Sequence, residues 1–273
     1  MKPSLGLEPL LALLSAGPLG TAEWTLPHSD VQIVPAPDGH LYRLLVSWPV
    51  GEPPAQGWPV LWLLDGEDNF AIATMTARRF ADVHPEIGKG VIVAIESGHR
   101  DRRVEDYTPP SPGYAIPNGF PACGLPTGGA ERFLDLIDEV FRPLVEGRWH
   151  LDPARQTLAG HGFGGLLALH AMFTGRPYST VVAVSPSLWY GGGSLAAGER
   201  RADPCLKARL LVVNGMQGND FDDHGGAAAE ALVTRWQRRG AEAEHLSLDG
   251  KSHGSTMLAA MGATVTTAFS AGR

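Results

Sequence analysis

QTLAGHGFGGLLALHAMFT, residues 156–174, is the stretch from which the fold of this chain is best predicted. An apolar run that ends near Ala159 leads through a glycine-rich turn into a second run whose apolar residues, from Leu166 to Phe173, recur at helical spacing. The sequence therefore predicts a strand, a very tight turn and a helix. Gly160 and Gly164 would allow the helix to pack closely on the strand, because neither residue carries a Cβ.

This turn matches the frame of the nucleophile elbow, G-x-S-x-G, which holds a serine hydroxyl above the end of a sheet. Here the frame is residues 160–164, and its central residue is Gly162, which has no side chain to attack with. His161 lies inside the same turn, and we expect it to be structural because its side chain would face away from the central position. The scaffold of a serine hydrolase is predicted, without its nucleophile.

Outside this stretch, continuous apolar runs alternate with helical patterns, as in a doubly wound sheet. Parallel buried strands are predicted at 60–64, 91–95, 181–184 and 209–214, an edge strand at 245–248, and a pair of antiparallel edge strands at 30–48. Helices are predicted at 70–80, at 131–146 with Pro143 kinking the last turn, and through Trp236. We therefore expect residues 23–273 to form one α/β domain with a mostly parallel sheet and helices on both faces.

Residues 97–128 are rich in Pro and Gly and show no periodic pattern, which predicts a long loop of the kind that is usually functional or mobile. Three arginines, Arg100, Arg102 and Arg103, lie within it. They could pair with nearby carboxylates such as Asp101 and Glu105. Alternatively, at least one guanidinium binds an oxygen-rich substrate or anchors the loop over the site.

The order of the elements after the elbow indicates where a catalytic acid and base would lie. The loop after the strand at 209–214 contains Asp220, Asp222 and Asp223, any of which could instead cap the next helix. His253 follows the last predicted strand, at the position of the general base of a hydrolase with the chain order Ser, Asp, His. Other serines that could replace the nucleophile, Ser185, Ser187, Ser252 and Ser255, are not on the elbow, so a relocated nucleophile is disfavoured.

Composition narrows the classes of partner and cofactor. The formal net charge of −7 and the pI near 5.8, with no basic stripe, disfavour nucleic acid. No apolar run is long enough to span a bilayer, so no membrane partner is expected. No cluster has metal-ligand spacing, and no phosphate-loop or dinucleotide motif is present, so neither a metal nor a cofactor is expected.

The N-terminus and the cysteines carry weaker signals. Residues 1–22 fit either a secretory leader or a disordered N-terminus; Glu8 and Pro18 interrupt the leader pattern, which slightly favours a cytoplasmic over a periplasmic location. Cys123 and Cys205 are predicted to be unpaired thiols rather than a loop-stapling disulfide.

Several motifs in register resemble the esterase D and IroE-like siderophore esterases of the α/β-hydrolase superfamily. From about residue 30 onward they are LWLLDGEDNF, RRVEDYTPP, GGAERFLDLIDEVFRPLVE, LAGHGFGGLLALHAMF, SPSLWY and SHGS. The resemblance implies an α/β-hydrolase fold, an elbow whose serine is replaced by Gly162, and His253 as general base. It implies an oxyanion hole from the amides of Phe163 and the Gly66-Glu67 turn. Asp220 is the preferred acid, although some members use a Ser–His dyad, and the residues expected to bind substrate are Arg102 or Arg103, Tyr107 and Trp189.

The function implied is hydrolysis of carboxylic esters, siderophore trilactones or other small acyl esters, through a serine acyl-enzyme. Without the serine that route is closed, so this chain is expected to be inactive or severely impaired; a serine hydrolase loses on the order of a millionfold in turnover with its nucleophile. The alternative is a pseudoenzyme that binds an ester or a ferric siderophore without cleaving it. The expected partner is thus a small molecule, and the sequence does not indicate an oligomeric state.

Overall fold

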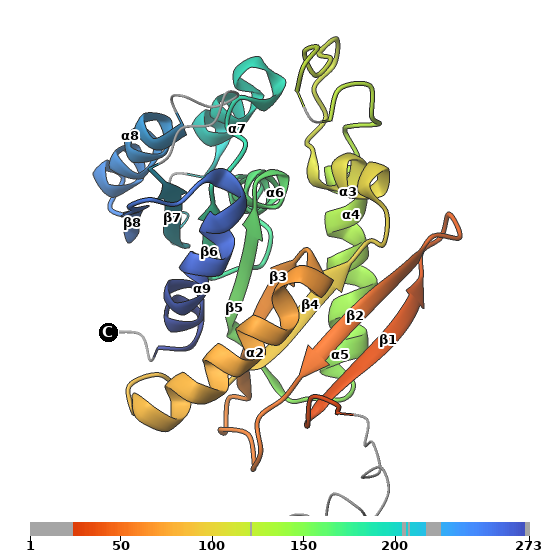
Figure 1. The fold of residues 1–273 in the computed structure, drawn as a ribbon, viewed down its shortest axis with the longest axis vertical. Coiled ribbons are helices and arrows are strands. Elements are labelled where there is room, and N and C mark those ends of the chain that lie inside the picture. The colour runs from red at the N-terminus through yellow and green to blue at the C-terminus, as the bar shows by residue number, and fades with distance from the viewer. Residues whose placement is uncertain (1–23, 121, 204–205, 207, 217–224, 271–273) are drawn as a thin grey trace, which may run out of the picture.

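The computed structural model describes residues 24–120, 122–203, 206, 208–216 and 225–270 of the chain (Figure 1). The sheet has eight strands in the order β1-β2-β4-β3-β5-β6-β7-β8. The strands are β1 (Ser29–Pro35), β2 (Leu41–Ser47), β3 (Trp58–Leu64), β4 (Val91–Glu96), β5 (Leu151–His161), β6 (Thr180–Val184), β7 (Arg209–Gly215) and β8 (Ala243–Leu248). β3 to β8 run parallel, and β1 and β2 form the antiparallel hairpin that the sequence predicted. Only β1 of that hairpin is an edge strand, because β2 also pairs with β4.

Helices cover both faces of the sheet, as expected of this fold class. One face carries α2 (Gly66–Val83) and α9 (His253–Phe269), which lie side by side in Figure 1. Besides the π-helical turn between α4 and α5 described below, the other helical elements are α3 (Arg100–Tyr107), α4 (Ala130–Leu136), α5 (Arg142–Glu146), α6 (Phe163–Phe173), the 3₁₀ turn η2 (Tyr190–Gly193), α7 (Ser194–Arg201) and α8 (Gly225–Arg238). Among the described residues, no helix combines the length and apolarity needed to cross a membrane.

The sheet separates two apolar cores, and β3 shows how the sequence supplies both. All residues of β3 are buried. Val60, Trp62 and Leu64 belong to one core and Leu61 and Leu63 to the other, because successive side chains of a strand point to opposite faces. A continuous apolar run is therefore what a central parallel strand requires.

The helix predicted at 131–146 is interrupted. Between α4 and α5 the chain makes a π-helical turn, η1 (Ile137–Phe141), and Pro143 is in the first turn of α5. Proline has no N–H to donate to the carbonyl of the preceding turn, and its ring clashes with that carbonyl. A widened turn before Pro143 accommodates both effects, so the irregularity begins earlier than the predicted kink in the last turn.

The stretch 97–128 is not entirely irregular, which corrects the prediction of a continuous loop. Residues 100–107 form α3, and Val104, Asp106 and Tyr107 face inward. The helix has little apolar periodicity because polar contacts hold it: Asp106 is fully buried and accepts hydrogen bonds from the Tyr42 hydroxyl (2.5 Å) and Arg102 Nε (3.0 Å). Burial raises the pKa of Asp106, against the opposing effect of these donors.

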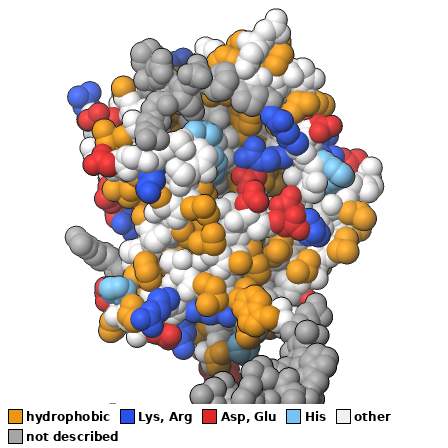
Figure 2. Space-filling model, viewed as in Figure 1, with side chains coloured by type: hydrophobic (Ala, Val, Ile, Leu, Met, Phe, Trp, Pro, Cys, Tyr) orange, Lys and Arg blue, Asp and Glu red, His pale blue; other side chains and the backbone are white. Residues whose placement is uncertain are grey.

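Charged side chains of both signs are interspersed on the face of the molecule drawn in Figure 2. Cys123 is an exposed free thiol, whereas Cys205 lies outside the described residues.

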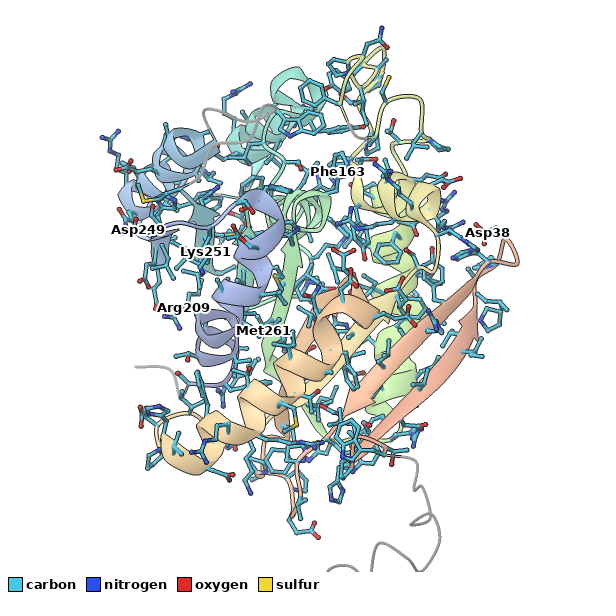
Figure 3. All side chains as sticks on the ribbon, viewed as in Figure 1. Asp38, Phe163, Arg209, Asp249, Lys251 and Met261 are labelled. Carbon is cyan, nitrogen blue, oxygen red and sulfur yellow. The ribbon has the colours of Figure 1, made fainter. Side chains whose placement is uncertain are left out.

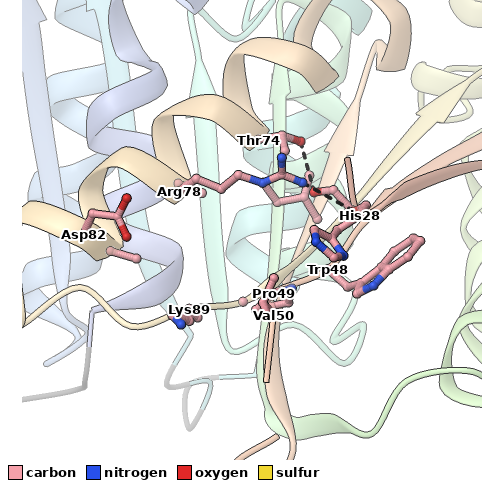
Figure 4. A pocket seen from close by; sticks show the side chains of 13 residues that line it. His28, Trp48, Pro49, Val50, Thr74, Arg78, Asp82 and Lys89 are labelled. Carbon is pink, nitrogen blue, oxygen red and sulfur yellow. Dashed lines mark hydrogen bonds between the residues drawn. The ribbon is translucent and has the colours of Figure 1, made fainter. Parts of the chain in front are cut away.

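A hollow of about 300 Å³ lies between α2 and the end of β2 (Figure 4). Its walls include Ser47, Trp48 and Arg78, and Arg78 donates to the backbone oxygen of Pro27 (2.5 Å). Since β4 begins beside this hollow, it lies at the end of the sheet opposite the elbow.

Candidate active site

The predicted elbow joins β5 to α6. Gly162, between them, has φ 59° and ψ −115°, a conformation that side chains other than glycine adopt only with strain. Its N–H donates to the carbonyl of Val184, and its own carbonyl accepts from the amides of Leu166 and Ser187, each at 3.0 Å. The turn is thus fixed by the next strand, by the helix and by the loop after β6.

Close packing of the helix on the strand depends on Gly160. A Cβ at Gly160 would lie 2.5 Å from the backbone carbon of Gly164, which is closer than real Cβ contacts allow. The start of α6 therefore rests directly on the end of β5. Phe163 becomes the first residue of α6 (labelled in Figure 3), so its amide has no acceptor within the helix.

His253 faces the central position of the elbow. A Cβ built on Gly162 would lie 3.3 Å from His253 Nε2 and 3.9 Å from Ser187 Oγ. A hydroxyl one bond beyond that Cβ is within reach of a hydrogen bond to Nε2. The structure thus brings together residue 162 and the histidine that chain order selected.

The start of α9 positions His253. Ser252 caps this helix and Ser255 completes a capping box, with the Ser252 amide donating to Ser255 Oγ at 3.0 Å. Thr256 Oγ1 donates to the Ser252 carbonyl at 2.7 Å. The two serines near His253 thus serve the backbone of the helix start, which gives each a structural role.

His161 is closer to the base than the sequence suggested. Its Nε2–H donates to the backbone carbonyl of His253 (2.8 Å), and the two rings lie 4.4 Å apart, centre to centre. This hydrogen bond to the backbone at the start of α9 is compatible with the structural role predicted for His161. Burial, followed by the nearby His161 and Arg103, lowers the pKa of His253 to about 4, so the ring is neutral at pH 7.

The two expected oxyanion turns lie beside each other, because β3 and β5 are parallel neighbours and α2 and α6 start where they end. Gly66 and Phe163 are the first residues of these helices, and their amides have no acceptor within the helix. The Glu67 amide does not fit the expected role, because it donates to Glu96 Oε2 at 3.0 Å. This is a correction: a carboxylate at the end of β4 already occupies that donor.

Ion pairs hold Arg102 and Arg103, but their partners are not the nearby Asp101 and Glu105. Arg102 pairs with Asp38 of the β1–β2 turn and with Asp106. Arg103 pairs with Asp65 and also donates to the His161 carbonyl at 3.3 Å, so it ties the β3 turn to the elbow. Both guanidinium groups are therefore structural links, and of the two only Arg103 adjoins the elbow.

The remaining predicted site residues have different surroundings. Tyr107 is fully buried and its hydroxyl accepts from the Asp65 amide (3.2 Å), so it supports the β3 turn and does not present a surface to substrate. Trp189 is half-buried in the loop between β6 and η2, and its ring centre lies 5.6 Å from that of Phe163 and 4.7 Å from that of Phe120. These three rings form an aromatic wall next to the elbow. Asp220 lies outside the described residues, as do Asp222 and Asp223.

Sequence reasoning considered Ser187 only as a relocated nucleophile and missed that its hydroxyl lies beside the central position of the elbow. It lies in the loop after β6, and β6 is the parallel neighbour of β5 in the sheet. The carboxyl ends of neighbouring parallel strands meet at one edge of the sheet, and that rule would have placed Ser187 beside the elbow.

Among the described residues no group of His, Cys, Asp and Glu could hold a metal ion.

Comparison with known proteins agrees with this geometry. Residues 39–258 match the family Esterase, described as "Putative esterase". The chain is 36% identical over 186 residues to a siderophore enterobactin esterase of Emericella nidulans and 38% identical over 181 residues to a siderophore triacetylfusarinine C esterase of Aspergillus fumigatus. These matches cover 62% and 60% of this chain, and 61% and 58% of the relatives, less than two thirds of their length.

The fold also matches solved structures. The siderophore hydrolase EstA of Aspergillus nidulans superposes with a TM-score of 0.77 at 26% identity, covering 90% of this chain and 97% of that one. The family expected from the motifs is thereby confirmed. The chain belongs to the Esterase family and has the α/β-hydrolase fold.

Proposed function

We propose that this chain carries the site of a carboxylic ester hydrolase built for siderophore esters, and that Gly162 leaves it inactive or severely impaired. The observation that carries the proposal is the distance of 3.3 Å from His253 Nε2 to a Cβ at position 162. A base at that distance serves only a nucleophile on residue 162 or a water beside it. The printed names of the relatives, an enterobactin esterase and a triacetylfusarinine C esterase, support siderophore esters as the substrate class.

In the complete reaction of such a site, a serine oxygen attacks the ester carbonyl while the neutral His253 takes its proton. The amides of Phe163 and Gly66 would receive the negative charge that develops on the carbonyl oxygen. The alcohol then leaves with the proton from His253, and water hydrolyses the acyl-enzyme in a second round. With glycine at 162 the first bond cannot form, whereas the base, the amides and the aromatic wall remain.

A second candidate is a binding protein that retains a ligand without cleaving it. It is favoured by the half-buried rings of Phe120 and Trp189, which lie against the buried Phe163 and offer apolar contact area next to the elbow. Glycine also fits the backbone of the elbow without strain, so loss of the serine does not disturb that wall.

The two candidates are separated by incubating enterobactin with this chain, with Gly162→Ser and with Gly162→Ser/His253→Gln, and following lactone opening by mass spectrometry. If the site is that of a hydrolase, only Gly162→Ser opens the lactone rapidly. A dedicated binding protein gives no opening in any variant, while Trp fluorescence reports tight binding of the intact or ferric ligand. If Gly162→Ser neither opens enterobactin nor binds it, both candidates are rejected.

A further inference from the structure

Ser187 is a buried hydroxyl next to the central position of the elbow, and the reaction described above does not use it. Only 5% of its surface is exposed. Its amide donates to the carbonyl of Gly162 (3.0 Å), which fixes the residue against the turn. Its Oγ lies 3.9 Å from the position of a Cβ on Gly162.

His253 approaches the same point, with Nε2 at 3.3 Å from that Cβ position. Among the described residues, neither Ser187 Oγ nor the ring of His253 is hydrogen-bonded to another side chain. The two groups therefore flank position 162, one able to take a proton and the other able to accept or donate a hydrogen bond. A water molecule at the site of a serine oxygen could hydrogen-bond to both.

We propose that Ser187 is a catalytic residue of this glycine-containing chain, where it orients the water that attacks the ester directly. The proposal rests on the proposed function, because it uses the same base and the same substrate class. The water donates one hydrogen to His253 Nε2 and the other to Ser187 Oγ, which leaves a lone pair free for the carbonyl carbon. Fixing both hydrogens restricts the orientation of the nucleophile, and orientation is a large part of catalysis.

The step balances without any further reactant. The water oxygen forms a bond to the carbonyl carbon while its proton passes to His253. The tetrahedral intermediate then breaks the bond to the alkoxy oxygen, which leaves as the alcohol with the proton from His253. No covalent intermediate forms on Ser187, whose hydroxyl holds the water and is unchanged at the end.

The alternative role for Ser187, as a relocated nucleophile, fits the geometry less well. Ser187 is not on the strand–helix turn, and the Phe163 amide begins the helix that follows position 162. An ester carbonyl held by that amide therefore has its carbon near position 162. This alternative makes a distinct prediction, a covalent adduct on Ser187.

The test measures hydrolysis of p-nitrophenyl acetate by the full chain, with His253→Gln giving the rate that does not depend on the base. We expect Ser187→Ala to lower the His253-dependent kcat about tenfold or more, with KM unchanged, and Ser187→Thr to recover most of it. The pH dependence of the remaining activity is expected to stay that of His253. Ser47→Ala is the matched control: its hydroxyl is equally buried, lines the remote hollow in Figure 4, and is expected to leave the rate unchanged.

Three outcomes would overturn the proposal. A fluorophosphonate adduct on Ser187 would make it the nucleophile. A kcat of Ser187→Ala equal to that of the parent chain would leave it without a role in turnover. Absence of any His253-dependent hydrolysis would exclude direct attack by water; Gly162→Ser then decides about the proposed function, since activity in that variant retains the hydrolase site and its absence rejects both.

Discussion

Replacing Gly162 by serine has two opposite consequences that the structure allows us to separate. The backbone at this position has φ 59° and ψ −115°. A side chain in such a conformation costs about 1–3 kcal/mol, and three hydrogen bonds prevent the turn from relaxing. The added Cβ also approaches His253 Nε2 at 3.3 Å, which the ring accommodates by a shift of a few tenths of an ångström. We therefore expect Gly162→Ser to unfold at lower urea concentration than the parent chain.

The gain in activity comes from the hydroxyl alone. A serine hydrolase without its nucleophile retains only about 10³–10⁴-fold acceleration over water, and restoring the nucleophile returns up to about a millionfold in turnover. We expect Gly162→Ser to hydrolyse p-nitrophenyl acetate at least ~10³-fold faster than the parent chain, with a burst of one p-nitrophenolate per active site. The variant is expected to be less stable and much more active.

Gly162→Ala separates the two effects, because it carries the same Cβ without the hydroxyl. Its free energy of unfolding should fall within about 1 kcal/mol of that of Gly162→Ser, and its activity should not rise. If Gly162→Ala is as stable as the parent chain, residue 162 is not in a strained turn. If Gly162→Ser is stable but gives no burst, the hydroxyl does not meet His253, and residue 162 does not face the base.

Three further predictions concern the packing, the ion pair and the base. A Cβ on Gly160 would lie 2.5 Å from the Gly164 backbone, so Gly160→Ala is expected to cost about 3 kcal/mol or more in urea unfolding. Arg103→Gln leaves the mostly buried Asp65 without its cation and should cost about 2–3 kcal/mol, which Asp65→Asn in the same chain should partly restore in a double-mutant cycle. The pKa of His253 is lowered to about 4, so between about pH 6.5 and pH 4 the unfolded chain binds a proton that the folded chain does not. The contribution of His253 to the free energy of unfolding should therefore be fully present above pH 6.5 and be lost as the pH falls towards 4. His253→Gln should remove this pH dependence of the free energy of unfolding.

The backbone of the site could be predicted from the sequence because its signals are local. Continuous apolar runs are typical of strands buried on both faces, and the glycines at 160, 162 and 164 indicated the elbow. The helix at 100–107 could not be found in this way, since ion pairs with distant residues hold it in place of an apolar stripe. The sequence pattern shows the charged residues of that segment but not the distant residues with which they form ion pairs.

The assignment of single groups failed where tertiary contacts decide. Glu67 was expected to offer its amide to substrate, but Glu96, on another strand, accepts that hydrogen bond. Tyr107 was expected at the substrate surface, but the turn after β3 covers it. The deciding contacts join residues 29 and 42 positions apart, and neither residue type carries a signal for them.

The backbone of the elbow does not depend on the side chain of residue 162, so in the proposed site one residue could separate ligand binding from chemistry. Its conformation is imposed by the hydrogen bonds to Val184, Leu166 and Ser187 and by the contact at Gly160, none of which involves a side chain on residue 162. Glycine therefore leaves the turn, the helix start and the orientation of His253 as they are, and it removes strain that any other residue would bring. The amides and the aromatic wall depend on that backbone and persist with it. A chain of this kind can lose the covalent step while the rest of the site stays assembled, so ligand affinity and turnover should respond independently to substitutions at 162.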